Sequence, residues 1–160
     1  MSTRPTLQEA RRKAEHYCAW QERCHSEVEG KLMDLGLNAE ERGELISHLI
    51  KEGFLNEERF ARAFARGKFR QLHWGRIKIV QGLKQKGLNQ LLINLALSEI
   101  SDEDYHDTLK SLAEKKARSL KGAPLQRKAS LLRYLQGRGF EQEYAFKAAE
   151  QVLKGGNAEW

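Results

Sequence analysis

A short phrase recurs three times along the sequence: a leucine, three residues of any kind, a glycine and then an apolar residue. Its glycines are Gly36, Gly87 and Gly139, so successive copies lie 51 and 52 residues apart. Each glycine follows a stretch with helical periodicity and precedes an apolar side chain, which is what a left-handed residue at the end of a helix requires. The phrase therefore predicts tandem repeats of about fifty residues, with positive φ at each of the three glycines.

Each repeat is long enough for three helices, and no segment alternates apolar and polar residues over the length of a strand. Helix starts are indicated by Ser26 with Glu29 and by Asn38 with Glu41, which resemble capping boxes. Asn56, Ser101 and Pro124 also stand at expected helix starts. We predict an all-α fold with helices over residues 6–22, 26–35, 39–52, 56–72, 75–86, 89–99, 102–121, 124–138 and 141–153.

The predicted repeats divide the chain at residues 1–53, 54–100 and 101–154, and the tail 155–160 is expected to be frayed. With 160 residues and 40% hydrophobic content, the chain can bury a core. A three-helix repeat cannot bury all its apolar faces alone. Neighbouring repeats are therefore expected to stack into an elongated, curved array.

The sequence offers little for catalysis or for binding a metal or a cofactor. The ligand types in HYCAWQERCH have gaps that do not match zinc sites, and Cys18 with His16 cannot face each other at i and i+2 on a helix. Most of the clustered acids stand at helix starts, where the helix dipole accounts for them. We expect no enzyme activity, no metal and no cofactor.

No apolar segment is long enough to span a membrane, and the N-terminal residues do not form a signal peptide. We therefore expect a cytoplasmic protein that makes no membrane contact. The two cysteines are too few for a disulfide framework, so reduced thiols are expected.

Positive charge is concentrated in the middle of the chain. The whole chain has a net charge of +6, yet between Glu58 and Glu99 there are nine Lys and Arg and no acidic residue, whereas the first 53 residues count to −2. Such a concentration favours a polyanion or an acidic protein surface as partner. The alternative is a solvated basic face without a partner.

The basic residues form a pattern on the two predicted helices of this region. On helix 56–72, an apolar stripe is expected at Phe60, Ala63, Phe64 and Gly67, and a second stripe carries arginines at i, i+3, i+7 and i+11. Arginines at these spacings repel one another, which favours a binding role. On helix 75–86, Ile77, Val80 and Leu83 are expected to be buried. Trp74, between the two helices, either stacks on a base or covers the core. The candidate contact residues are Arg59, Arg62, Arg66, Lys68, Arg70, Trp74, Arg76, Lys78, Lys84 and Lys86.

The segment GFLNEERFARAFARGKFR, followed by WGRIKIVQGLKQKGL, resembles the signature of the RecX family of bacterial RecA regulators. The positions that keep the family pattern are Arg59, Phe60, Gly75, Lys78, Leu83 and Gly87. Asn56 and Glu57 stand where two aspartates are usual, and Gly82 where a glutamate is common. CHSEVEGKLMDLGL and LLRYLQGRGFEQEYAFKA resemble the flanking family segments, so the likeness covers nearly the whole chain.

The resemblance implies tandem three-helix repeats and a non-enzymatic monomer that lies on RecA filaments formed on single-stranded DNA. It implies a modulator, expected to inhibit the recombinase in DNA repair, homologous recombination and the SOS response. Because the basic stretch has no convincing aromatic platform, we expect its binding to the bare strand to be weak and salt-dependent. The alternative from the residues alone is a helical repeat module that binds nucleic acid without any recombinase. A filament regulator needs the recombinase for its effect, whereas an autonomous module does not.

Overall fold

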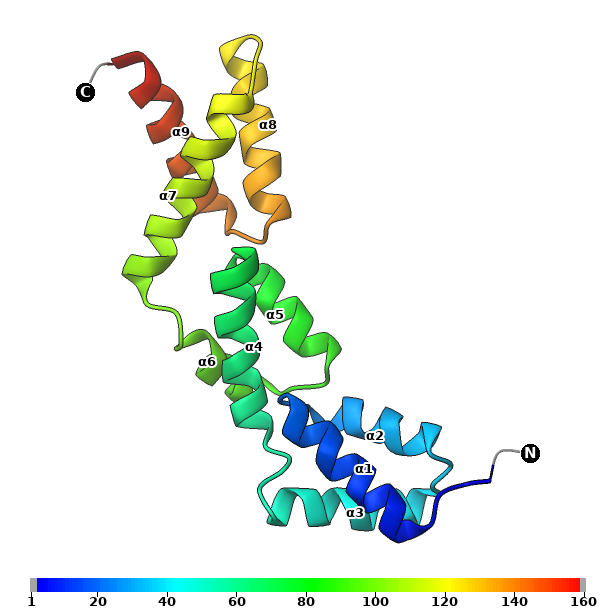
Figure 1. Cartoon of the computed structure of the whole chain (residues 1–160). Helices are drawn as coiled ribbons and strands as arrows, with labels where there is room; N and C mark the ends of the chain where they lie inside the picture. Colours follow the sequence, from blue (N-terminus) through cyan, green and yellow to red (C-terminus); the bar gives the residue numbers. More distant parts are fainter. Residues whose placement is uncertain (1–2, 159–160) are drawn as a thin grey trace. The chain divides into compact units, whose positions relative to one another are not determined.

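The computed structural model describes residues 3–158, with side chains described over residues 3–154. In that part of the chain all regular secondary structure is helical, and nine helices follow one another in three groups of three (Figure 1). The all-α prediction is confirmed. The helices are α1 (Leu7–Trp20), α2 (His25–Asp34), α3 (Ala39–Lys51), α4 (Glu57–Leu72), α5 (Arg76–Gln85), α6 (Gln90–Leu97), α7 (Asp102–Ser119), α8 (Pro124–Gly137) and α9 (Gln142–Ala158).

The predicted helix boundaries agree with the structure to within two residues, with one exception. Helix α9 continues to Ala158, beyond its predicted end at 153 and into the segment 155–160 that was expected to be frayed. The last two residues, 159–160, lie outside the described part of the chain.

Most of the expected start signals act as caps. The Asn38 side chain accepts a hydrogen bond from the backbone N–H of Glu41 at 2.9 Å, and Glu41 accepts one from the Asn38 N–H, which completes a capping box. The capping box at Ser26 was wrong. Helix α2 begins at His25, so its cap is Cys24, whose backbone N–H donates to Glu27 at 3.2 Å.

The three repeated glycines all adopt the left-handed conformation, as predicted. Their φ angles are 86° at Gly36, 84° at Gly87 and 97° at Gly139. In each copy the N–H of the following residue donates to the carbonyl of the phrase's leucine at 3.2 Å, as Leu37 does to Leu32. The residue after each glycine is also buried, so the turn both satisfies a helix end and inserts an apolar side chain into the core.

The chain forms two compact units that do not coincide with the three groups of helices. The first unit comprises residues 1–64 and 83–96, and the second comprises residues 65–82 and 97–160. The middle helices α4, α5 and α6 are therefore shared, because each has residues in both units. Each unit is described by itself below.

In the first unit, α1, α2 and α3 pack against one another. Their buried faces supply the small and branched side chains of the core, including Ala10, Ala14, Val28, Leu32 and Leu49. The alanines of α1 allow close approach of the helices. Residues 12, 13, 16 and 20, described below as part of a pocket, lie outside this buried face of α1, whereas Tyr17, which also lines the pocket, packs partly against the core.

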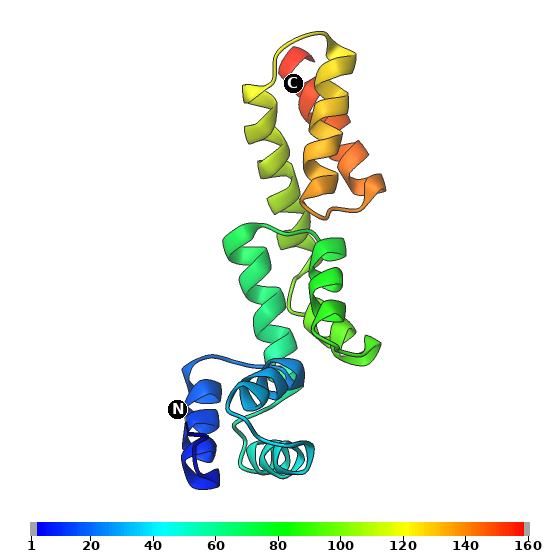
Figure 2. The same cartoon turned by 90° about the vertical axis from the view of Figure 1, so that its right-hand side faces the viewer.

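In the second unit, α7, α8 and α9 lie side by side, as both views show (Figures 1 and 2). Tyr105 is fully buried among aromatic rings, with its ring centroid 6.0 Å from that of Phe69 and 5.2 Å from that of Phe140. Leu131 and Leu135 of α8 are also fully buried.

The second repeat's apolar stripes differ from those expected. Ile77 is 44% exposed, whereas Ile79 is fully buried, because the inward positions of α5 follow Gly75 at intervals of four. On α4 the buried residues are Phe60, Ala61, Ala65 and Phe69, while the expected Ala63, Phe64 and Gly67 are only partly buried. Leu83 is buried as predicted and Val80 is half-buried.

Within the second unit, the turn after α8 contacts the start of α5. The Gly75 N–H donates to the carbonyl of Arg138 at 2.7 Å, and the Ile77 N–H donates to that of Gly139 at 2.9 Å. A Cβ atom at Gly75 would lie 2.3 Å from the carbonyl carbon of Gly139, so only glycine fits there. In this way the third glycine phrase accepts two amides at the start of a helix of the second repeat.

Candidate functional site

The first two arginines of the predicted stripe have partners within the first compact unit. Arg59 forms an ion pair with Glu22, and it also donates to the carbonyls of Gly53 at 3.0 Å and Phe54 at 3.3 Å. Arg62 is paired with Glu58 one turn earlier, with 3.1 Å between Nε and Oε2. Arg59 is therefore engaged with the loop before α4 as well as with a carboxylate.

The other two arginines belong to the second compact unit. Arg66 pairs with Glu99, and Arg70 is exposed with no ion pair among the residues whose side chains are described. Three of the four arginines thus have carboxylate partners, two of them from distant parts of the chain. Exposed pairs of this kind contribute only about 0–1 kcal/mol each, but they reduce the charge available to a ligand.

A cluster of two lysines and a tryptophan lies at the turn between α4 and α5. The ammonium nitrogens of Lys68 and Lys78 lie 5.0 and 4.8 Å from the ring centroid of Trp74. Trp74 is half-buried, and its backbone N–H donates to the Lys68 carbonyl at 3.1 Å. A cation near an aromatic ring at this distance is attracted by the ring quadrupole. Both roles considered for Trp74, stacking on a base and covering the core, stay predictions.

Arg76 is tied into the second unit by several contacts. Its guanidinium lies 3.8 Å from the ring centroid of Tyr105 and binds the carboxylates of Asp102 at 2.7 Å and Glu141 at 3.2 Å. The Tyr105 hydroxyl donates to Glu141 and accepts a hydrogen bond from the Arg76 backbone N–H at 2.9 Å. Burial, followed by the bond to Glu141, raises the pKa of Tyr105 well above its ordinary value. These contacts give Arg76 a structural task.

The remaining two candidates, Lys84 and Lys86, lie in the first unit. The Lys86 ammonium is 3.0 Å from a carboxylate oxygen of Glu27, and this hydrogen bond raises the pKa of Lys86. The backbone carbonyl of Lys86 also accepts a hydrogen bond from the Ser26 hydroxyl at 3.1 Å. Lys84 is exposed and has no ion pair within residues 3–154.

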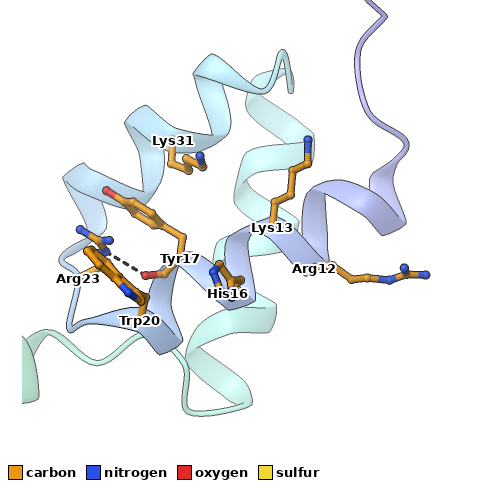
Figure 3. A pocket seen from close by; sticks show the side chains of 7 residues that line it. All are labelled: Arg12, Lys13, His16, Tyr17, Trp20, Arg23 and Lys31. Atoms are coloured by element: carbon orange, nitrogen blue, oxygen red, sulfur yellow. Dashed lines mark hydrogen bonds between the residues drawn. The ribbon is translucent and has the colours of Figure 1, made fainter.

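The structure adds a pocket that the charge pattern did not indicate (Figure 3). It lies in the first unit, has a volume of about 490 Å³, and is lined by side chains of α1, α2 and the segment between them. No carboxylate lines it. Its cationic and aromatic lining includes Arg12, Lys13, Tyr17, Trp20, Arg23 and Lys31. The net charge of the first repeat is negative, and this sum concealed the local concentration of positive charge. The usable signal was the spacing of residues 13, 16, 17 and 20, which places them on one face of a helix.

Among the described residues, no group of three or more His, Cys, Asp and Glu side chains is arranged to hold a metal ion. Cys18 and Cys24 are both buried and neither forms a disulfide, and burial raises the pKa of the Cys18 thiol. Nor does any helix in the described part of the chain combine the length and the apolar character that crossing a bilayer needs.

The fold and these surfaces define a class: a helical repeat protein of tandem three-helix domains whose exposed chemistry consists of cations, ion pairs and aromatic rings. Residues 56–97 match the second three-helix domain of RecX, and residues 102–148 match the third. The chain therefore belongs to the RecX family of regulatory proteins, which confirms the resemblance seen in the sequence.

Relatives and a solved structure agree with this assignment. The chain is 32% identical over 128 residues to the regulatory protein RecX of Chlorobaculum tepidum, covering 80% of this chain and 78% of that protein. It is 34% identical over 122 residues to that of Pelodictyon phaeoclathratiforme, covering 74% of each. Its fold is similar to the crystal structure of RecX from Lactobacillus salivarius, with a TM-score of 0.81 at 23% identity, over 91% of this chain and 96% of that one.

Proposed function

We propose that this protein binds RecA filaments formed on single-stranded DNA and inhibits the recombinase. The observation that carries the proposal is its membership of a family whose relatives are named regulatory proteins. The protein acts without catalysis of its own, as a monomer in the bacterial cytoplasm, during DNA repair by homologous recombination and in the SOS response. It needs no metal or cofactor for this role.

The described side chains narrow the set of contact residues. Arg59, Arg66 and Arg76 are engaged with carboxylates of the same chain, so contact with a filament would first have to break those pairs. In the second unit, Lys78 lies beside the ring of Trp74 and Arg70 is exposed, and neither forms an ion pair with a described side chain. A filament offers phosphates and acidic protein surface, both of which attract such cations.

The decisive experiment is the ATPase activity of a RecA recombinase on single-stranded DNA, with increasing amounts of this protein. We expect ATP hydrolysis to fall, and we expect Arg70→Gln with Lys78→Gln to weaken the inhibition. A matched control removes two charges from the third repeat, Lys110→Gln with Lys147→Gln, and should leave inhibition unchanged. Unaltered ATPase activity at saturating protein would contradict the proposal.

A second candidate is an autonomous nucleic-acid-binding module, which is favoured by the cationic pocket around Tyr17 and Trp20. Titration of labelled protein against bare single strand and against preformed filament, at two salt concentrations, separates the two. A regulator binds the filament more tightly because the filament adds protein surface and many adjacent sites. Equal affinity for both would make the autonomous module the better assignment.

A further inference from the structure

The pocket in the first unit contains an aromatic surface that is open to solvent. Trp20 is the last residue of α1, and 73% of it is exposed. Beside it, the guanidinium of Arg23 stacks on the ring of Tyr17 at 3.7 Å from the centroid and lies 5.7 Å from the centroid of Trp20 (Figure 3). The Nε–H of Arg23 donates to the Tyr17 carbonyl at 3.0 Å, which holds the guanidinium in place. The two rings and the guanidinium thus form a preorganised stacking surface.

The cations around this surface are not held in ion pairs. Arg12, Lys13 and Lys31 form no ion pair with any side chain described between residues 3 and 154, and the Lys31 ammonium lies 5.6 Å from the centroid of Tyr17. The arginines of α4 differ, because three of the four have carboxylate partners. The pocket's cations therefore keep more of their charge for a ligand than the residues that the sequence singled out.

We propose that this pocket binds one unpaired nucleotide of single-stranded nucleic acid, with its base stacked on Trp20 and its flanking phosphates on Lys13 and Lys31. Every base has a π face, so an exposed indole beside a fixed guanidinium accepts any base. An acidic peptide would satisfy the cations but would leave the open indole face without a matching partner. A base pair within a duplex is already stacked on both faces, so the site selects single strands.

The inference deepens the proposed function. It rests on that function in one respect, namely that the bound strand is the one on which a recombinase assembles. It places a DNA contact in the first repeat, whose net charge is negative, and not only in the basic middle repeat. Local geometry decides this, because charges farther away than about a Debye length are screened, so the cations that line the pocket dominate its attraction for phosphate.

The test uses the full chain and the fluorescence anisotropy of a labelled oligothymidylate. Trp20→Ala should weaken binding of the single strand on the order of tenfold, since one base stack is lost, while circular dichroism stays unchanged. Trp20→Phe should retain part of the affinity. Leu125→Ala is the matched control, because Leu125 is 81% exposed in the third repeat, and it should have no effect.

A second pair of variants examines the phosphate contacts. Lys13→Gln with Lys31→Gln should flatten the dependence of log affinity on log salt by about 1.4, at roughly 0.7 per contact. The control Lys115→Gln with Lys121→Gln removes the same net charge elsewhere and should leave the slope unchanged. For a duplex with the same number of phosphates, Trp20→Ala should not alter affinity.

Three results would overturn the inference. The first is an equal affinity of Trp20→Ala and Leu125→Ala for the single strand. The second is a loss of affinity in Trp20→Ala that is equally large for single strand and duplex. The third is an unchanged affinity for bare strand with weakened binding to preformed filament, which would assign the pocket to an acidic protein segment. Trp20-dependent strand binding without any effect on recombinase ATPase would uphold this inference and refute the proposed function. Inhibition of the recombinase ATPase without Trp20-dependent strand binding would uphold the proposed function and refute this inference.

Discussion

Replacing Tyr105 with Phe examines the contacts that join α5, α7 and α9 within the second unit. The hydroxyl accepts the backbone N–H of Arg76, the first residue of α5, and donates to the carboxylate of Glu141 just before α9. The substitution removes only the oxygen and leaves a ring of the same shape in the core, so the change in stability reports on these two hydrogen bonds.

The expected magnitude follows from what each bond contributes. A hydrogen bond to a charged group contributes about 1.5–3 kcal/mol, and a helix amide left without an acceptor costs about 1–3 kcal/mol when water cannot reach it. Arg76 is only half-buried, so water relieves part of the second cost. We expect Tyr105→Phe to lower the free energy of unfolding by about 2–4 kcal/mol.

Urea unfolding followed by circular dichroism provides the measurement. The matched control is Tyr144→Phe in the same unit, because the Tyr144 hydroxyl makes no hydrogen bond within the described side chains, and its ring, which meets that of His106 edge-on, is kept by the substitution. The control should stay within about 0.5 kcal/mol of the parent protein. If Tyr105→Phe were no more destabilising than Tyr144→Phe, the assignment of these bonds as a stabilising junction would be refuted.

Three further predictions concern other parts of the chain. The Cβ of Gly87→Ala would meet no neighbouring atom, so the substitution should lower the free energy of unfolding by about 1–2 kcal/mol from the left-handed backbone alone. Gly139→Ala should lower it further, because its Cβ would lie 2.7 Å from the backbone nitrogen of Lys78. Equal losses of stability in urea unfolding would contradict this. Changing the four arginines of the α4 stripe together to Gln should preserve the helix content seen by circular dichroism but weaken regulation of the recombinase; the residues are Arg59, Arg62, Arg66 and Arg70. Unimpaired regulation would mean that this face is merely solvated. The hydrogen bond from His48 lowers the pKa of Glu15, so the stabilisation it gives is present above pH of about 4.3 and is lost as the pH falls through the lower folded-state pKa. Glu15→Gln should remove this acid-dependent part from thermal unfolding measured between pH 3 and 7, and an unchanged pH profile would count against it.

The fold was predictable because its determinants are local. A left-handed glycine after a helix, an apolar residue behind it and capping side chains such as Asn38 act within a few residues, and the sequence displays them directly. The one misplaced cap, at Ser26, arose because Cys24 takes the cap position and Ser26 bonds instead to a distant carbonyl.

The surface was less predictable because charge is compensated at long range. Arg59 and Arg66 find carboxylates 37 and 33 residues away, so a run without acids along the chain is not a surface without acids. The same argument applies in reverse to the first repeat. None of its acids lines the pocket, so the cations around Tyr17 and Trp20 stand together, a juxtaposition that no count of charges reveals.

Because the glycine turn of the third repeat contacts the start of α5, the repeats seen in the sequence are not independent folding units. A fragment ending at residue 100, where the second repeat ends by sequence, would lack the carbonyls of Arg138 and Gly139 that accept the amides of Gly75 and Ile77. It would also lack the carboxylates of Asp102 and Glu141 that neutralise Arg76. Repeats of this protein therefore cannot be deleted or exchanged one at a time at their sequence boundaries. The interchangeable piece is a turn together with the helix start that it completes, so recombination between relatives preserves the fold only where both are inherited together.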